Sequence, residues 1–261
     1  MDPSKRNKFK KEIFAYYKRH RRDLPWRRTR DPYKIFVSEI MLQQTQVTRV
    51  RLKYRSFIKR FPDFASLARA SSREILRAWQ GLGYNRRALA LKRASEMVVK
   101  RYHGKLPNSM EELMLLPGVG KATAGAILAY AFQMPVPFIE TNIRRVFIHF
   151  FFPRSKKVKD ETILKLIEAL ADEKDPREWY YAVVDFGAEL GRGRENPNRR
   201  SAHYKKQELF KGSRRELRGK MLALFLKRPG IGEREVSKKL GMPVKKIKEV
   251  LVSLRRDGLV F

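Results

Sequence analysis

The sequence has no cysteine among its 261 residues. The chain can therefore form no disulfide bond, and it cannot bind zinc or an iron–sulfur cluster through thiolates. Histidine is also rare: His20, His103, His149 and His203 are scattered and form no pair at the i, i+4 spacing of a helix. We therefore expect no histidine-based metal site, and no cofactor is predicted.

Long apolar runs are missing as well. No uninterrupted apolar stretch approaches the roughly 20 residues that a membrane-spanning helix needs, and the N-terminus lacks the pattern of a secretory signal peptide. Neither a G-x-S-x-G elbow nor a glycine-rich nucleotide fingerprint after a strand is present. We expect a cytoplasmic, nucleoid-associated protein with no membrane partner, in which carboxylates and lysines carry any chemistry.

Acidic residues are scarce beside basic ones. The 27 Asp and Glu face 60 Lys and Arg, which gives a formal net charge of +33. This charge is far beyond what solubility requires, and the usual partner for such a field is a polyanion. Because 43% of the residues are apolar, the chain should also fold around a core. The composition therefore favours a folded nucleic-acid-binding protein.

Helical spacing dominates the chain, and no internal repeat or strand-rich region is present. Before residue 191, helices are predicted at about 4–20, 33–44, 46–60, 63–69, 72–80, 86–102, 121–131, 160–171 and 177–190, with another that begins after Glu140. Gly191 to Lys211 is basic and loop-rich. After it, helices at about 214–227, 233–240 and 244–255 and a short strand at 259–261 fit a winged-helix module. The fold class predicted is all-α.

The stretch from Leu115 to Ala126 predicts a helix, a glycine hairpin and a second helix. Pro117, Gly118 and Gly120 end the first helix, and the alanine-rich run after Lys121 begins the second. The outward N–H groups of a helix N-terminus beside a lysine attract an anion, and phosphate is the anion expected. The alternative is an ordinary turn between packed helices, with Lys121 as a simple N-terminal lysine.

Two carboxylates stand in contexts that are unusual for surface charges. Glu39 lies inside an apolar helix, and Glu140 follows Val-Pro-Phe-Ile at the start of a helix. A carboxylate among apolar groups has a raised pKa and can act as a general acid. One near a helix start stays ionised more readily and can stabilise a developing cation. Alternatively, Glu39 is a partly exposed helix residue and Glu140 is an N-cap or first-turn acid.

Such a pair suits the cleavage of an N-glycosidic bond, by analogy with O-glycosidases. The acid would protonate the leaving base, and the anion would support the oxocarbenium character of the sugar. The amide cluster Gln43-Gln44-Thr45-Gln46 fits this chemistry, since Gln side chains can enter a base stack once a nucleotide is flipped out. Its alternative is a polar surface at a helix C-terminus.

Together these segments resemble the helix-hairpin-helix DNA glycosylase superfamily, and within it the MutY-type adenine glycosylases. The matching segments follow the family order over about residues 10–190. They are Leu24–Arg27, Pro32–Tyr33, Ser38–Val47, Trp79–Tyr84, Leu116–Ala126 and Asn142–Val146. The string Ser-Glu-Ile-Met-Leu-Gln-Gln-Thr-Gln-Val is highly specific.

The resemblance implies a role for each matching residue. Glu39 would be the catalytic acid, Gln43 and Gln44 would probe the DNA stack, and the hairpin would clamp a phosphate. The DNA-binding residues that it implies are Gln43, Gln44, Thr45, Tyr84, Arg86, Gly118, Val119, Gly120, Lys121, Thr123 and Asn142. In this family a monovalent cation can also bind hairpin carbonyls, which here lie near Leu115, Pro117 and Val119.

The chain departs from the family pattern at four places. Glu140 stands where the second catalytic carboxylate is usually Asp, which moves the charge by about 1.5 Å and can alter rate or base preference. Ala122 stands where bifunctional relatives carry a Schiff-base lysine, which implies a monofunctional enzyme. The four cluster-binding cysteines are absent, so charge and packing within Gly191–Lys211 must replace the cluster. A winged-helix unit stands where typical members read an opposing 8-oxoguanine.

The expected organisation has three parts. A six-helix lobe with the hairpin covers 31–134, a second lobe combines 1–30 with 135–212, and the winged-helix module covers 213–261. The expected activity is hydrolysis of a mispaired adenine opposite G or 8-oxoguanine in double-stranded DNA by a monomer. One alternative is a glycosylase for mismatched thymine, uracil or a deaminated purine. Another is a DNA-structure-binding protein without catalysis.

Overall fold

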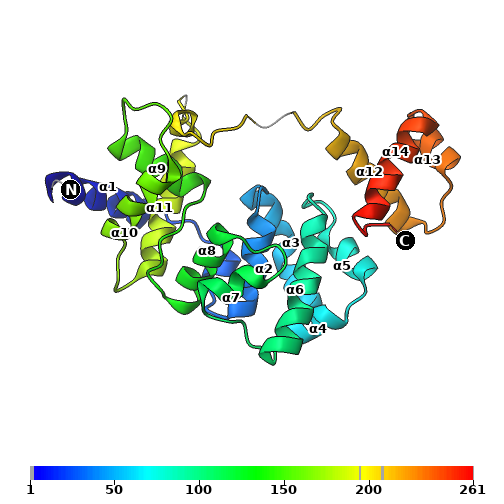
Figure 1. The fold of residues 1–261 in the computed structure, drawn as a ribbon, viewed down its shortest axis with the longest axis horizontal. Coiled ribbons are helices and arrows are strands. Elements are labelled where there is room, and N and C mark those ends of the chain that lie inside the picture. Colours follow the sequence, from blue (N-terminus) through cyan, green and yellow to red (C-terminus); the bar gives the residue numbers. More distant parts are fainter. Residues whose placement is uncertain (1–2, 194, 207–208, 261) are drawn as a thin grey trace. The chain divides into compact units, whose positions relative to one another are not determined.

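The computed structural model describes residues 3–193, 195–206 and 209–260 and shows an all-helical fold (Figure 1). Within these ranges the only ladder contact is an isolated parallel bridge between Val158 and Ser201. The first eight helices are α1 (Pro3–His20), α2 (Pro32–Leu42), α3 (Val47–Arg60), α4 (Phe64–Arg69), α5 (Ser72–Trp79), α6 (Arg86–Tyr102), α7 (Met110–Leu115) and α8 (Lys121–Phe132). The others are α9 (Thr141–Phe151), α10 (Asp160–Leu170), α11 (Pro176–Leu190), α12 (Arg214–Lys227), α13 (Glu233–Leu240) and α14 (Val244–Arg256).

The described residues form two compact units. The first unit is drawn from Met1–Glu39, Asn108–Leu115 and Val119–Lys206, and the second from Ile40–Pro107, Leu116–Gly118 and Gln207–Phe261. Helix α2 passes from the first unit to the second just after Glu39. No helix in the described part of the chain is long and apolar enough to cross a membrane.

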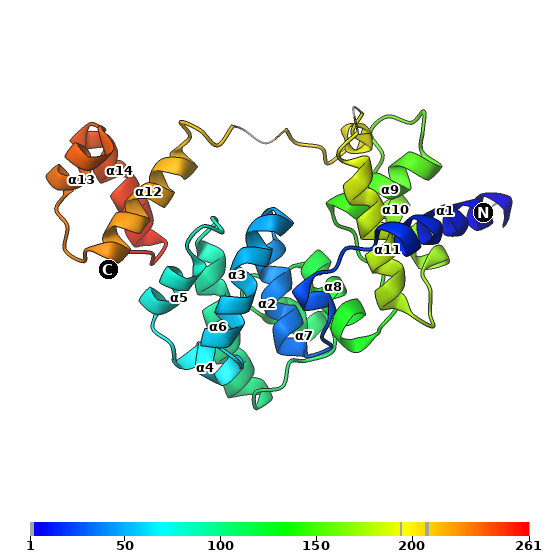
Figure 2. The ribbon, with the colours of Figure 1, turned by 180° about the vertical axis from the view of Figure 1, so that it is seen from behind.

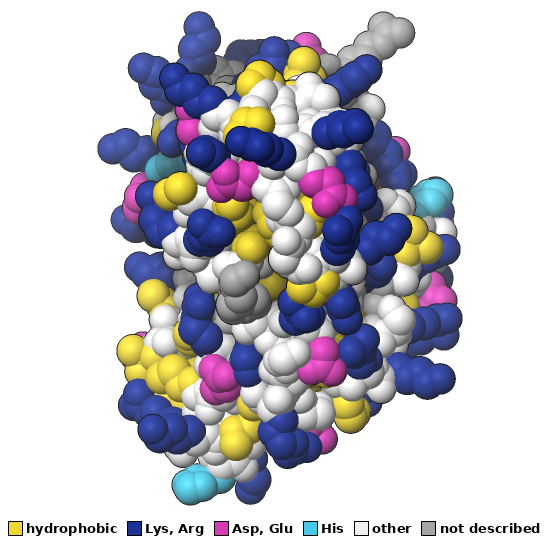
Figure 3. All heavy atoms as spheres, turned by 90° about the vertical axis from the view of Figure 1, so that its right-hand side faces the viewer, with side chains coloured by type: hydrophobic (Ala, Val, Ile, Leu, Met, Phe, Trp, Pro, Cys, Tyr) yellow, Lys and Arg dark blue, Asp and Glu magenta, His cyan; other side chains and the backbone are white. Residues whose placement is uncertain are grey.

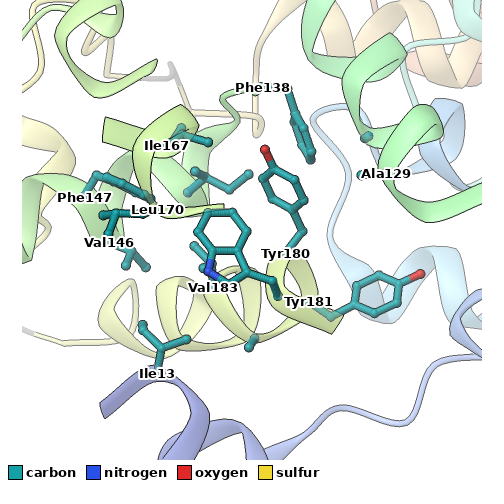
Figure 4. Packing of buried hydrophobic residues seen from close by; sticks show 14 of the residues in the cluster. Ile13, Ala129, Phe138, Val146, Phe147, Ile167, Leu170, Tyr180, Tyr181 and Val183 are labelled. Atoms are coloured by element: carbon teal, nitrogen blue, oxygen red, sulfur yellow. The ribbon is translucent and has the colours of Figure 1, made fainter. Parts of the chain in front are cut away.

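Helices α9 and α11 lie side by side at the centre of the first unit (Figures 1 and 2). Their facing side chains, among them Phe147, Trp179 and Tyr180, are almost fully buried (Figure 4). The two helices approach so closely that a Cβ atom on Gly187 would lie 2.3 Å from the carbonyl oxygen of Asn142. Glycine at position 187 therefore permits the close packing of α11 against the start of α9.

Helices α3 to α6 form the core of the second unit around Trp79, whose side chain is fully buried. Ser71 is the N-cap of α5 and forms a capping box with Glu74. The Ser71 hydroxyl accepts a hydrogen bond from the Glu74 N–H, and the Glu74 carboxylate accepts one from the Ser71 N–H. Asp63 and Ser66 form the same reciprocal pair at the start of α4. These caps satisfy amide groups that a helix start leaves unpaired.

Two expectations need correction or remain open. The helix predicted over 33–44 ends at Leu42, because Gln44 adopts a left-handed conformation with φ of 50°. This conformation ends the helix and turns the amide cluster into a loop. The three C-terminal helices are present, whereas Leu259 and Val260 belong to no strand and Phe261 lies outside the described residues. The coarser expectation of an all-helical protein is therefore confirmed.

Candidate active site and nucleic-acid interface

Glu39 lies on α2 between side chains that are buried in the core. Ser38 and Ile40, its neighbours in the chain, are 1% and 0% exposed, while Glu39 itself keeps partial access to solvent. The residues around Glu39 are apolar on both faces of α2. Their burial keeps this helix inside the protein even though it carries a carboxylate. The carboxylate therefore lies among largely apolar side chains and keeps some exposure to solvent.

Glu140 caps the N-terminus of α9. The extended segment that contains Pro135 and Pro137 precedes it and cannot continue a helix. One carboxylate oxygen of Glu140 accepts hydrogen bonds from the N–H groups of Asn142 and Ile143 at 2.8 and 2.9 Å, and the other accepts from the Asn142 Nδ2 at 3.2 Å. The N-cap alternative for Glu140 is therefore realised, and it places a carboxylate at the positive end of a helix.

The two carboxylates differ in their protonation, and the charge of Glu140 affects that of Glu39. Burial, and then the negative charge of Glu140, raise the pKa of Glu39 to about 8, against the opposing charge of Arg27. Burial also raises the pKa of Glu140, although its hydrogen bonds with Asn142 and Ile143 favour the ionised form. Because only Glu140 has these donors, the proton that the pair holds at neutral pH resides on Glu39. One side chain is then an acid and the other an anion.

Tyrosine rings and an ion-pair network support the carboxylates, and the sequence did not predict either. Tyr130 and Tyr181 stack with their centroids 4.4 Å apart, and the Arg27 guanidinium lies 4.2 Å from the Tyr181 ring. Arg27 donates two hydrogen bonds to Asp185 at 2.7 and 2.8 Å. Burial alone would raise the pKa of Asp185, but the bonds from Arg27 and Arg22 lower it. Arg27 is thus held in place beside Glu39.

The hairpin after α7 has the geometry expected of an anion site. Gly120 is the N-cap of α8 and has no side chain, so it forms no capping hydrogen bond of its own. Lys121 is exposed at the first helical position, and Thr123 is half-buried two residues later, while Val119 is buried. A helix N-terminus beside an exposed lysine suits a phosphate.

Gly118 occupies a position that favours glycine. Its φ of 84° lies in the left-handed region, and a Cβ atom there would lie 3.0 Å from the Cβ of Ala90 on α6. Its carbonyl oxygen accepts a hydrogen bond of 2.9 Å from the Nε2 of Gln43. The amide loop and the hairpin are therefore tied together through Gly118.

We expect Gly118→Ala to weaken DNA binding by about tenfold, because the strained turn would shift the carbonyl that holds Gln43 and the amide groups that follow. The measurement is a fluorescence-anisotropy titration with duplex DNA, accompanied by thermal unfolding. Gly104→Ala provides the control, since Gly104 also has a positive φ of 79° but its added Cβ meets nothing within 4 Å. Equal affinity losses in the two variants would mean that the contact with Ala90 is irrelevant.

Arg87 organises the loops that carry four predicted DNA-binding residues, and the sequence reasoning missed it. Its guanidinium donates to the carbonyl oxygens of Ile40 and Met41, both at 2.8 Å, and to the Thr45 hydroxyl at 2.7 Å. It also donates to the Gly83 carbonyl at 3.1 Å. Thr45 is therefore a link between loops, and the exposed Gln44 lies on the loop that Arg87 holds.

Tyr84 and Arg86 lie on the loop before α6 and at its start. Tyr84 has a φ of 45° and is 38% exposed, and its hydroxyl accepts a hydrogen bond of 2.9 Å from Arg215. Arg86 is exposed and lies 3.8 Å from Asp257. Both residues face groups of the C-terminal helices, which the sequence did not predict.

The monovalent cation that the resemblance implies near Leu115, Pro117 and Val119 stays a prediction. In the described part of the chain, no backbone N–H donates to the carbonyl oxygens of Leu115, Pro117 or Val119. Carbonyl oxygens are suitable ligands for a hard cation, and a cation there would add positive charge at the phosphate site. No group of three or more metal-ligating side chains occurs among the described residues.

A protein-family model described as the HhH-GPD superfamily base excision DNA repair protein matches residues 37–171. The match includes Glu39, the amide loop, the hairpin and Glu140. The chain belongs to this superfamily. The superfamily identification confirms the resemblance that the motifs indicated.

The relatives found by comparison extend the match to individual proteins. The chain is 38% identical to an adenine DNA glycosylase from Buchnera aphidicola over 174 residues, or 66% of this chain and 50% of the relative. It is 43% identical to an adenine DNA glycosylase from Mycolicibacterium smegmatis over 136 residues, or 52% of this chain and 46% of the relative. The chain thus spans about half the length of the curated relatives that it matches.

A solved structure of a thermostable thymine-DNA glycosylase has a similar fold. The two chains superimpose with a TM-score of 0.66 and are 28% identical. The match covers 74% of this chain and 91% of the thymine-DNA glycosylase chain. The helix-hairpin-helix glycosylase fold is therefore supported by structure as well as by sequence. The C-terminal helices from Arg214 onward lie outside the superfamily match.

In this HhH-GPD chain, hydrogen bonds join the segment that contains Asn196 and Asn198 to the start of α9. The buried Arg145 donates to the Oδ1 of Asn142 at 2.8 Å, to the Gly187 carbonyl at 2.5 Å and to the Oδ1 of Asn196 at 3.1 Å. The Asn198 amide donates to the Thr141 carbonyl at 2.9 Å. These side chains therefore brace the start of α9, and with it the cap at Glu140.

We expect Arg145→Met to lower the free energy of unfolding by about 2–4 kcal/mol, because one buried and two partly buried acceptors would lose a charged donor. At about 2–4 °C per kcal/mol, the melting temperature should fall by roughly 4–16 °C. Differential scanning calorimetry measures both quantities. Arg154→Met is the control, since Arg154 is exposed and should leave stability within about 0.5 kcal/mol of the starting protein. A loss no larger than that of the control would remove Arg145 from the brace.

Proposed function

We propose that this protein is a monofunctional DNA glycosylase that hydrolyses the N-glycosidic bond of a mispaired adenine opposite G or 8-oxoguanine. The observation that carries the proposal is the pairing of Glu39, whose pKa is raised to about 8, with the N-cap carboxylate Glu140. An acid that is protonated at neutral pH beside an anion is what glycosidic cleavage requires. The identity to adenine DNA glycosylases supports adenine as the base.

In the proposed reaction, Glu39 donates its proton to a ring nitrogen of the flipped adenine. The bond between C1′ and the base then breaks, and its electron pair leaves with the protonated base. The Glu140 carboxylate stabilises the positive charge that develops on the sugar. Water adds to C1′ and gives a proton to the Glu39 carboxylate, which restores the starting state.

The remaining sequence-predicted residues take positions around DNA in this proposal. Gln43, Gln44 and Tyr84 contact the base stack, and the hairpin from Gly118 to Thr123 holds a phosphate. Thr45 and Asn142 act through neighbouring residues. Arg87 donates a hydrogen bond to the Thr45 hydroxyl, and the Asn142 amide donates one to the Glu140 carboxylate. The spread of Lys and Arg on the face in Figure 3 is compatible with a DNA partner.

The organisation predicted from the sequence belongs to the proposal as well. We retain lobes of 31–134 and of 1–30 with 135–212, and a winged-helix type of unit at 213–261. We also retain a monomeric, nucleoid-associated enzyme. Ala122, the second residue of α8, provides no amine for attack on C1′. Strand breakage should therefore depend on added alkali.

The proposal is tested by single-turnover reactions on duplexes with one A:G or one A:8-oxoguanine pair. We expect a break at the adenine after treatment with alkali and little breakage without it. An A:T duplex of the same sequence is the control. The absence of alkali-labile breaks from both mispairs would reject adenine as the substrate.

A second candidate is a glycosylase for mismatched thymine, uracil or a deaminated purine. It is favoured by the 28% identity to a thymine-DNA glycosylase and by Glu140 in place of the usual Asp. The same assay with G:T, G:U and hypoxanthine duplexes separates it from the first candidate. Binding without base release from any duplex would favour the third candidate, a protein that recognises DNA structure without catalysis.

A further inference from the structure

Arg177 is a buried cation in the first turn of α11, and it takes no part in the proposed chemistry. The residue is only 5% exposed. Removing an arginine from water is costly unless other groups compensate for the lost hydration. In the ranges that the structure describes, its hydrogen bonds all go to backbone carbonyl oxygens instead of a carboxylate. The positions of these carbonyls therefore show what Arg177 holds.

The three carbonyls belong to segments of the first unit that are far apart in the sequence. The Nη1 of Arg177 donates to the Tyr130 carbonyl at 3.0 Å. Its Nη2 donates to the carbonyls of Arg27 and Thr29 at 2.9 and 2.6 Å. Tyr130 lies near the end of α8, whereas Arg27 and Thr29 lie just before α2. The planar guanidinium thus ties both segments to the start of α11 in one fixed geometry.

Thr29 passes this restraint on to the start of α2. Its hydroxyl accepts a hydrogen bond of 3.1 Å from the Asp31 N–H. The Asp31 carboxylate in turn accepts from the N–H groups of Tyr33 and Lys34 at 2.9 and 3.3 Å, which caps the helix. Glu39 lies on the same helix, two turns further on. The place of its carboxylate therefore depends on where the start of α2 is held.

The two other residues that Arg177 holds have side chains within electrostatic reach of Glu39. Burial and then the charge of Glu140 raise the pKa of Glu39 to about 8, and the positive charge of Arg27 opposes this rise. Burial raises the pKa of the Tyr130 phenol, and the charge of Glu39 raises it further. Arg177 therefore grips the backbone of two residues whose side chains surround the acid.

Tyr181 joins these side chains to the helix that carries Arg177. It lies one turn after Arg177 and points to a different side of α11 from Tyr180 (Figure 4). The Arg27 guanidinium lies 4.2 Å from the centroid of the Tyr181 ring, and the Arg177 guanidinium lies 5.5 Å from it. The Tyr130 ring stacks on the Tyr181 ring with centroids 4.4 Å apart. A change at Arg177 would therefore disturb the whole group of side chains beside the acid.

We propose that Arg177 is a positioning residue, which keeps Arg27 and Tyr130 in register with Glu39 through its bonds to their backbone. The inference rests on the proposed function in that Glu39 is the acid of base release. Arg177 acts through its neighbours and needs no contact with DNA. A purely structural tie would stabilise the fold through the same bonds but would leave the protonation of the acid unchanged. This difference can be measured.

The first measurement is the single-turnover rate of adenine release from an A:G duplex. Arg177→Met removes the donors, and we expect the rate at neutral pH to fall about 10–100-fold while duplex affinity stays within about twofold. Arg177→Lys keeps a charge but not the planar fork, so it should recover part of the rate. Tyr180→Phe is the control, because it deletes a buried hydrogen bond of 2.7 Å to the Val136 carbonyl in the same unit. It should lower the melting temperature without slowing base release.

The second measurement follows the protonation of Glu39 without substrate. Carbon-13 in the glutamate carboxyl groups reports their titration by NMR, and the signal that Glu39→Gln removes belongs to Glu39. We expect Arg177→Met to move this titration to higher pH by roughly 0.5–1 unit, because Arg27 would no longer be held where its charge favours the ionised acid. The decline of the rate at high pH should move in the same direction. Tyr180→Phe should leave the titration where it was.

Each outcome decides the inference. An unchanged rate in Arg177→Met, or a slower rate with an unchanged titration of Glu39, would overturn it and reduce Arg177 to a structural tie. If Arg177→Met does not fold, the same two measurements on Arg177→Lys decide in the same way. Because the titration needs no DNA, a wild-type protein that fails to release adenine would reject the proposed function and leave the test of Arg177 intact.

Discussion

Glu39→Gln is expected to lower the single-turnover rate of adenine release by roughly 10²–10⁴-fold while duplex affinity stays within about twofold. Glutamine has nearly the shape of the acid but has no proton to give to the leaving base. Rates are measured with protein in excess, and affinity is measured by anisotropy. Glu168→Gln, an exposed change on α10, is the control that should leave both values as they were.

The pH dependence follows from the protonation state. Burial and the charge of Glu140 raise the pKa of Glu39 to about 8, so Glu39 is protonated below this pH and loses its proton above it. The rate of the starting protein should therefore be constant through neutral pH and fall about tenfold per unit at higher pH. The small residual rate of Glu39→Gln should lack this decline.

Glu39 is expected to raise the rate of base release but to lower the stability of the folded protein at higher pH. An unfolded glutamate has a pKa of about 4.3, whereas the folded value is about 8. The protonated side chain is tolerated in the fold, so stability is full below the unfolded pKa and decreases as pH rises toward the folded pKa. Glu39→Gln removes this loss, and at about pH 9 the variant should melt at a higher temperature than the starting protein.

This combination distinguishes chemistry from structure. A slower and more stable variant indicates a functional acid whose burial costs stability. If Glu39→Gln instead released adenine at the original rate, Glu39 would have no part in the mechanism. If the variant lost both rate and stability, Glu39 would be needed for the fold, and its apolar position would have a structural reason.

The parts of the site that could be predicted from the sequence depend on local signals. The helix starts at Ser71 and Glu140 follow from caps, which involve residues two or three apart. Pro117 and Gly118 likewise mark the hairpin, because backbone conformation at these positions is set by the residues themselves. Glu39 was identified because a charge within an apolar helix conflicts with the pattern around it.

The parts that could not be predicted depend on contacts between distant segments. Arg145 bonds to Asn196, 51 residues away, and Arg27 bonds to Asp185 across 158 residues. No spacing in a single sequence indicates such pairs. The pKa of Glu140 shows the same limit: proximity to a helix start suggested ready ionisation, but burial, which comes from the tertiary fold, raises the pKa.

Glu140→Gln should lower the rate of adenine release by about 10²–10³-fold, the size of effect that follows removal of one preorganised electrostatic group. The amide oxygen of glutamine can still accept the hydrogen bonds from Asn142 and Ile143, so the cap is largely kept. We therefore expect the free energy of unfolding to change by about 1 kcal/mol or less. Single-turnover kinetics and urea unfolding measure the two effects.

Asp175→Asn is the matched control for the loss of a charged cap. Asp175 accepts a hydrogen bond of 3.0 Å from the Glu178 N–H at the start of α11, in the same unit. Its replacement should cost a similar free energy of unfolding without slowing base release. Equal kinetics in the two variants would reduce Glu140 to a helix cap.

Glu140→Asp tests the departure from the usual family residue. Aspartate keeps the negative charge and is a favourable N-cap, but its shorter side chain moves the carboxylate by about 1.5 Å, a shift large enough to affect catalysis. We expect a loss of about tenfold, smaller than that of Glu140→Gln, because the charge is retained at an altered distance. A rate above that of the starting protein would mean that the longer side chain is not adapted to adenine release, and would favour a different base as the substrate.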